Sequence, residues 1–183
     1  MKFQKIFLLF FVQIFFSSCC FEKIWEWLNP DDKCTLQQCA YEGDNLHLDG
    51  FYYHQIKEGQ DFVHVESFIL YRNGVVMGAL GDSCLDKAER SIIRMSKDVS
   101  RINGNIDNWG LFEVSDSSIS LEYYLPSMYG HHTYLMRGTI LNDSTFHMTQ
   151  GKKSNESGFS AIDRIYNFHK LEAKPDSTNK YFR

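Results

Sequence analysis

The chain has 183 residues, a formal net charge of −4, 43% hydrophobic residues, 15% aromatic residues and 3 prolines. This length and apolar content suffice for one domain with a substantial core, and they argue against a chain that is disordered throughout. The acidic balance argues against nucleic-acid binding, because a nucleic-acid-binding domain carries a basic face.

Residues 1–18 predict a secretory signal peptide. Lys2 and Lys5 make the N-terminus positive, a short apolar run follows at Ile6–Phe16, and two small residues, Ser17 and Ser18, end it. The run is shorter than the roughly 20 apolar residues of a transmembrane helix, so a cleaved leader is favoured over a transmembrane anchor.

The end of the leader, Phe16-Ser17-Ser18-Cys19, resembles the lipobox of bacterial lipoproteins. This resemblance implies a lipid such as palmitate on Cys19, and hence an exported protein anchored in the bacterial cell envelope, in the outer membrane. Acyl chains contribute about 0.8 kcal/mol per buried methylene, enough for stable anchoring when more than one is attached. Lipidation of Cys20 and cleavage without a lipid are the alternatives.

Residues 19–45 are expected to form a linker with a short amphipathic helix. Apolar residues recur at the spacing of one helical face, and Asn29-Pro30 then ends the pattern. The apolar residues of this face are Phe21, Ile24, Trp25 and Leu28. Such a helix lies on lipid headgroups, packs against the following domain or serves only as a spacer.

Residues 46–171 predict a β-rich domain, followed by a tail at 172–183. The first strands are expected at 46–54, 62–72 and 75–80, with a type I′ turn at Asn73-Gly74 in which Gly74 has positive φ. A helix is expected at 85–101, with Asp82 or Ser83 as its cap.

The second half of the domain alternates between apolar and polar residues with the period of two that strands require. The face predicted to be buried carries Ile119, Leu121, Tyr123, Tyr134, Met136, Ile140, Phe146 and Met148. The face predicted to be wet carries Ser120, Glu122, Thr133, Arg137, Thr145 and Thr149. A polar loop is expected at 151–163 and a last strand at 165–171.

These segments predict a mainly β fold, an antiparallel up-and-down meander of about eight strands with one helix inserted after the third. Eight strands can close a barrel that fills with side chains or holds one small ligand. A half-barrel curled over the helix is the alternative.

Three segments of the domain resemble the small lipocalin-like lipoproteins of bacteria. They are Leu48-Asp49-Gly50-Phe51-Tyr52-Tyr53, Leu70-Tyr71-Arg72-Asn73-Gly74-Val75-Val76 and Trp109-Gly110-Leu111-Phe112. The resemblance implies a lipocalin-like barrel, and most members of this group have no assigned function. We therefore expect binding of a small apolar ligand or of an envelope partner, with the membrane contacted through the lipid anchor.

Aromatic residues on the apolar strand faces are the expected ligand-facing positions: Tyr123, Tyr134, Phe146, Tyr166 and Phe168. In a ligand-holding barrel they would line a cavity, where apolar walls and a few hydroxyls are usual. In the alternative, a structural or assembly lipoprotein, they fill the core and the protein acts through an interface with another protein.

No other chemistry is expected. The sequence lacks the usual catalytic, nucleotide-binding and zinc motifs, so no enzymatic activity, cofactor or metal is predicted. Glu113 and Glu122 could approach each other on adjacent strands, but both are expected on the solvent face. Cys34 and Cys39 could form a local disulfide in an exported protein, and Cys84 could pair with either.

Overall fold

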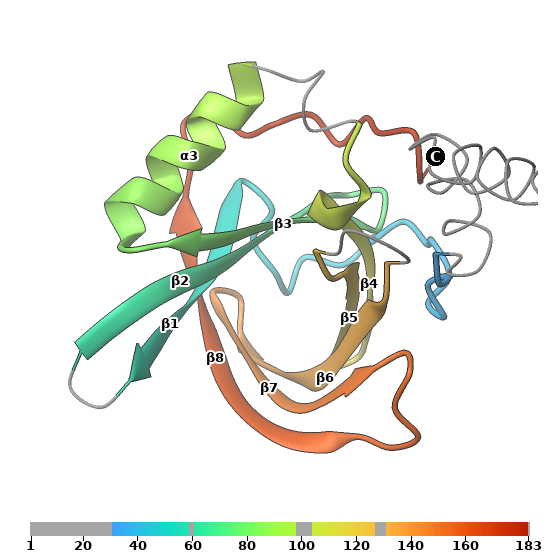
Figure 1. Cartoon of the computed structure of the whole chain (residues 1–183). Coiled ribbons are helices and arrows are strands. Elements are labelled where there is room, and N and C mark those ends of the chain that lie inside the picture. The colour runs from blue at the N-terminus through green and yellow to red at the C-terminus, as the bar shows by residue number, and fades with distance from the viewer. Residues whose placement is uncertain (1–30, 59–60, 98–103, 127–130, 183) are drawn as a thin grey trace, which may run out of the picture.

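The computed structural model describes residues 31–58, 61–97, 104–126 and 131–182. Eight antiparallel strands form one closed barrel in which each strand pairs with its neighbours in the chain, and β1 pairs with β8 (Figure 1). The strands are β1 (Gly50–Glu58), β2 (Asp61–Leu70), β3 (Val75–Asp82), β4 (Trp109–Ser115), β5 (Ser118–Tyr124), β6 (Thr133–Asn142), β7 (Thr145–Lys153) and β8 (Ser160–Lys170).

Helix α3 (Leu85–Lys97) follows β3, and a one-turn helix, η1 (Ile106–Asn108), leads into β4. The prediction of an antiparallel meander with one helix after the third strand is therefore confirmed, and the barrel is closed. None of the helices in the described ranges is long and apolar enough to cross a membrane. The predicted signal peptide, Cys19 and the amphipathic helix at 21–28 lie outside the described residues.

The two ends of the barrel differ. One end, the closed end, carries the turns at 71–74, 115–118 and 142–145, and the other, the mouth, carries the connections β1–β2, β5–β6 and β7–β8. At the closed end Gly74 has φ of +80°, as predicted, but Asn73 is not in the positive-φ region. The Gly74 N–H bonds to Tyr71 O and the Tyr71 N–H to Val75 O, so the connection is a three-residue hairpin loop rather than a type I′ turn.

Residues 31–49 cross the outside of the barrel and then cover its closed end (blue in Figure 1). Residues 31–40, the strap, begin at the mouth, where the Asp32 N–H donates to His131 O. Residues 41–49, the plug, follow at the closed end, where the Tyr41 N–H donates to Arg72 O. Tyr41 and Leu46 join the interior core, so the plug closes this end with apolar side chains.

Buried apolar residues form two clusters, one inside the barrel and one outside. The interior cluster includes Tyr52, Phe68, Phe112, Leu121, Met136, Phe146 and Tyr166. The exterior cluster lies where α3 covers the barrel wall, and it includes Phe51, Ile69, Met77, Ile92 and Trp109. The strand residues of this cluster are buried on the outward side because α3 replaces solvent there.

The predicted tail also packs on the barrel. The Tyr71 hydroxyl donates to Pro175 O at 2.9 Å, and the Lys174 amine donates to Leu48 O in the plug. Tyr181 and Phe182 pack against the exterior cluster. The C-terminal segment thus stabilises the plug through a hydrogen bond, and it packs against the barrel wall beneath α3.

The predicted strand faces are confirmed on the apolar side. Six of the eight residues are buried, and Tyr134 and Ile140 are half-buried. On the predicted wet face, Arg137 and Thr149 are exposed, but Glu122 and Thr133 are each only 1% exposed. The prediction is wrong for these two residues because the strap covers the outer surface of β5 and β6 at this point.

Candidate functional site: a cavity at the mouth

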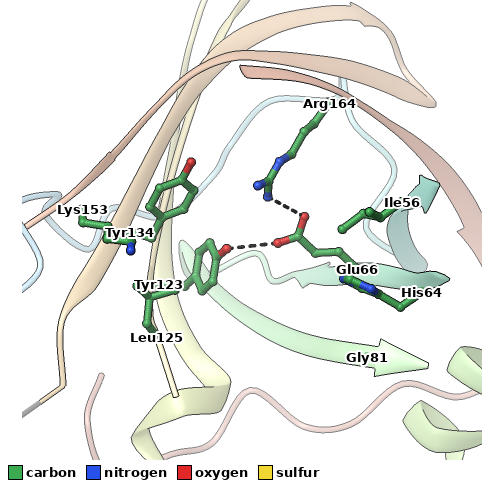
Figure 2. Close-up of a pocket in the computed structure, with 9 residues that line it drawn as sticks. All are labelled: Ile56, His64, Glu66, Gly81, Tyr123, Leu125, Tyr134, Lys153 and Arg164. Carbon is green, nitrogen blue, oxygen red and sulfur yellow. Dashed lines mark hydrogen bonds and ion pairs between the residues drawn. The ribbon is translucent and has the colours of Figure 1, made fainter. Parts of the chain in front are cut away.

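A cavity of about 620 Å³ opens at the mouth of the barrel (Figure 2). Strand alternation turns its lining side chains inward, and seven of the eight strands contribute to it. The lining residues are Ile56, His64, Glu66, Gly81, Tyr123, Leu125, Tyr134, Lys153 and Arg164.

Glu66 carries a buried negative charge beside this cavity. Glu66 is 3% exposed, and three side chains donate hydrogen bonds to its carboxylate. Oε1 accepts a hydrogen bond from the Tyr123 hydroxyl at 3.0 Å, and Oε2 pairs with Arg164 Nη1 at 2.9 Å (dashed lines in Figure 2). Oε2 also accepts from the Tyr166 hydroxyl at 2.5 Å. The charge is therefore both neutralised and hydrogen-bonded, as a buried carboxylate requires.

The electrostatics of the site keep the hydroxyls of Tyr123 and Tyr166 and the guanidinium of Arg164 protonated. Burial, reinforced by the negative charge of Glu66, raises the pKa of the Tyr123 and Tyr166 hydroxyls well above 10. Burial alone would lower the pKa of Arg164, but the neighbouring carboxylate outweighs it and the pKa rises. Both tyrosines thus remain donors, and Arg164 remains a cation at physiological pH.

Below Glu66 the barrel is filled by aromatic rings. Tyr166 stacks on Phe146 with centroids 5.0 Å apart, and Phe68 lies 5.0 Å from Tyr123. Phe146 in turn contacts Tyr52 near the closed end. The cavity therefore occupies only the mouth half of the barrel, and packed aromatic rings lie beneath it.

The structure brings together some of the predicted ligand-facing residues. Tyr123 and Tyr134 line the cavity, with their rings edge to face at 5.9 Å. Tyr166 contributes its hydroxyl to the floor through Glu66. Phe146 does not line the cavity because it fills the core beneath Tyr166, and Phe168 packs against Tyr52 and His47 near the plug.

The charged residues of the site were not predicted. Glu66 shares the inward parity of Phe68, and Arg164 shares that of Tyr166, so a charge at an inward position of a strand was the available signal. Lys153 was missed for a further reason. The segment predicted as a polar loop at 151–163 contains the end of β7 and the start of β8.

Glu122, in contrast, holds the strap and does not line the cavity. Its Oε2 accepts from the backbone N–H groups of Thr35 and Leu36, at 2.6 and 2.9 Å, and its Oε1 accepts from the Thr133 hydroxyl at 2.7 Å. Glu113 Oε1 accepts from the Gln37 N–H at 3.0 Å. The two carboxylates thus bind backbone, which is a structural role.

The expected disulfide between Cys34 and Cys39 is not present. Cys34, Cys39 and Cys84 are free thiols. Cys34 is half-buried beside Tyr124 and Glu122, whereas Cys39 is exposed. Burial, and secondly the negative charge of Glu122, raise the pKa of the Cys34 thiol to about 12.

Two histidines at the mouth bind the beginning of the strap. His131 Nδ1 lies 2.7 Å from Asp31 Oδ1, and His132 Nδ1 lies 2.7 Å from Asp32 Oδ2. We call these two pairs the clasp. His131 Nε2 also lies 3.0 Å from Asp107 Oδ1. Within the described ranges, no group of three His, Cys, Asp or Glu side chains is arranged to hold a metal ion.

Comparisons of this chain with protein-family models, with curated proteins and with solved structures gave no match.

Proposed function

We propose that the barrel is a non-catalytic, lipocalin-like binding domain for a small ligand with substantial apolar surface, held at the membrane of the cell envelope by a lipid on Cys19. The observation that carries the proposal is the mouth cavity of about 620 Å³. Small-molecule sites are concave and usually measure roughly 300–1,000 Å³.

The construction of the barrel supports this proposal. The plug and the aromatic floor close one end, so a ligand enters and leaves through the mouth. Ile56, Leu125 and the rings of Tyr123 and Tyr134 offer apolar walls to the cavity. A few fixed polar groups among apolar walls are what a site needs to orient a small molecule.

The state of Glu66 favours binding over catalysis. A general base needs a lone pair directed at the substrate, and a nucleophile needs an exposed reactive atom. Both oxygens of Glu66 already accept hydrogen bonds within the barrel, and the residue is 3% exposed. The carboxylate acts here as the internal counter-ion of Arg164.

Native mass spectrometry of the mature protein purified from its own envelope tests the binding proposal. We expect a retained small molecule that is lost when a cavity-lining side chain is enlarged, for example in Ile56→Trp. Thr149→Trp, at an exposed position of the barrel wall, is the control and should retain the molecule. If the purified protein carries no small molecule and binds no amphiphile in a titration, the alternative is favoured, namely an assembly lipoprotein that acts through an interface with another protein.

The anchor is tested separately. The positive N-terminus, the short apolar run and the Ser-Ser-Cys order support lipidation of Cys19. Metabolic labelling with a fatty acid should mark the wild-type protein and the Cys20→Ala variant, but not Cys19→Ala. Equal labelling of the Cys19→Ala variant and the wild-type protein would contradict the proposed lipid anchor.

A further inference from the structure

The polar groups that face the mouth cavity are mainly hydrogen-bond donors. A guanidinium has five N–H donors and an ammonium has three. Glu66 Oε2 pairs with Arg164 through Nη1, which leaves further N–H groups of Arg164 beside the cavity. Lys153 lines the same cavity. A ligand that satisfies these groups must therefore bring acceptors.

The charged acceptors of the site, the two oxygens of Glu66, are already in use. Glu66 Oε1 accepts from Tyr123, and Oε2 accepts from Tyr166 and Arg164. Of the pair, Glu66 is the deeper member, since its side chain is 4% exposed and that of Arg164 is 29% exposed. A ligand in the cavity thus meets the cation before it meets the carboxylate.

The charges that line the cavity sum to a positive value. Arg164 and Lys153 are cations, Glu66 is an anion, and His64 adds positive charge when it is protonated. Glu156 approaches from the β7–β8 connection, where its Oε2 accepts from the backbone N–H of Lys153, but it is not among the lining residues. Inside a protein, unlike charges attract more strongly than in water because the effective dielectric constant is lower.

We propose that the ligand is a small amphipathic anion, with its acidic head attracted by the cations Arg164 and Lys153 and its apolar part against the apolar walls of the cavity. This inference rests on the proposed binding function and adds the charge of the ligand. The Tyr134 ring lies 5.9 Å from the Arg164 guanidinium carbon and, with Glu66, fixes its position. Glu66 and the tyrosines hold the cation in place before the ligand arrives, which reduces the entropy lost on binding.

Three chain-matched probes test the proposal by calorimetric titration of the whole protein: octyl sulfate, octanol and octyltrimethylammonium. We expect octyl sulfate to bind most tightly and octyltrimethylammonium most weakly. Added salt should weaken the binding of octyl sulfate and leave that of octanol unchanged. If octanol binds as tightly as octyl sulfate, the charge inference is wrong and the binding function stands.

Two adjacent lysines of β7 provide a matched pair of variants. Lys153 lines the cavity, whereas Lys152 points the other way, with its ammonium 5.8 Å from the Phe159 ring. Lys153→Gln should weaken octyl sulfate binding about fivefold and leave octanol unaffected, while Lys152→Gln should change neither. Lys153→Glu should shift the preference toward octyltrimethylammonium.

Each result has a defined meaning. Equal effects of Lys153→Gln and Lys152→Gln on octyl sulfate would overturn the proposal, because attraction to the protein surface in general would then explain the binding. Binding of none of the three probes to the wild-type protein, together with an empty protein in native mass spectrometry, would overturn the proposed function and this inference with it.

Discussion

Glu122 and Thr35 are 87 residues apart in the chain, yet the carboxylate accepts both the backbone N–H and the hydroxyl of Thr35, at 2.6 and 3.0 Å. Leu36 donates its N–H to the same oxygen. The buried Glu122 side chain on β5 therefore accepts the backbone N–H groups of the strap, as the carbonyl groups of a neighbouring strand would do in a sheet. Because two of these three donors are backbone N–H groups, the residue types in the strap give little sign of the contact.

Removal of this carboxylate should destabilise the fold. Glu122→Ala leaves the N–H groups of Thr35 and Leu36 without their acceptor, and we expect the free energy of unfolding to fall by about 2–4 kcal/mol. Glu113→Ala is the control, since Glu113 is more exposed and accepts only the Gln37 N–H among the strap donors; its effect should stay within about 0.5 kcal/mol. Urea unfolding curves of both variants measure the difference, and equal midpoints would contradict the role given to Glu122.

The strap also depends on Gly74. An added Cβ at this position would lie 2.1 Å from the backbone oxygen of Cys39, and φ of +80° is unfavourable for a β-branched residue. Gly74→Val should therefore cost clearly more than the roughly 1 kcal/mol of ordinary propensity effects. At Gly158 an added Cβ meets nothing within 4 Å, so Gly158→Ala should be nearly neutral. Thermal melts that rank the two variants equally would count against the tight approach at Gly74.

The clasp at the mouth should make the strap sensitive to acid. Partial burial alone would raise the pKa values of Asp31 and Asp32, but hydrogen bonds and charge from the histidines, with Ser154 at Asp32, lower both below 3.8. A carboxyl group whose folded pKa is lowered stabilises the fold above its unfolded pKa of about 3.9, and that contribution is lost as the pH falls through the folded value. Between pH 5 and pH 2, the Asp31→Asn, Asp32→Asn double variant should therefore lose less stability than wild type.

The control for the clasp is Asp163, which pairs with His147 on the outer wall and has a side chain 88% exposed. Asp163→Asn should follow the wild-type acid curve. Hydrogen exchange at residues 31–36 would localise the effect, and unchanged exchange there down to pH 2 would argue against release of the strap.

Burial of Cys34 should protect its thiol. With a pKa of about 12, almost none of it is thiolate at pH 8, and the thiolate is the reactive form. Iodoacetamide should thus modify the exposed Cys39 before Cys34, and unfolding in urea should remove the difference. Peptide mapping after a short exposure measures both sites; faster modification of Cys34 in the folded protein would show that the strap is not seated.

Phe146 lies in the filled part of the barrel, whereas Tyr134 lies on the wall of the cavity. Phe146 is fully buried among Tyr52 and Tyr166, so Phe146→Ala should cost about 3–5 kcal/mol. Tyr134 is half-buried on the cavity wall, and Tyr134→Ala should cost less because less packing is lost. Chemical denaturation gives both values, and similar losses would mean that the mouth is as tightly packed as the core.

The sequence was sufficient for the fold where a strand keeps the period of two. Leu121, Met136 and Phe146 were placed correctly because the interior of a barrel imposes that period on every strand. The sequence was insufficient where the strap, a segment without strand or helix periodicity, covers the sheet. Glu122 and Thr133 have the pattern of wet residues, and only the strap, whose path is set by backbone hydrogen bonds, makes them buried.

The candidate site was only partly predictable for a related reason. Tyr123 and Tyr134 follow from alternation, because an aromatic residue on the inward face must either fill or line the interior. Glu66 and Arg164 lie 98 residues apart, and each alone is an unfavourable inward charge. Only closure of the barrel brings them to 2.9 Å, and a single sequence contains no local signal for that pairing.

The clasp also determines where a membrane tether would pull on the barrel. Asp31 and Asp32 hold the start of the strap beside the cavity opening, far from the plugged end. An extended chain spans about 3.5 Å per residue, so a lipid on Cys19 would keep Asp31 within about 40 Å of the bilayer. A force applied through this lipid would therefore act on the two Asp–His pairs of the clasp before it acts on any strand of the barrel.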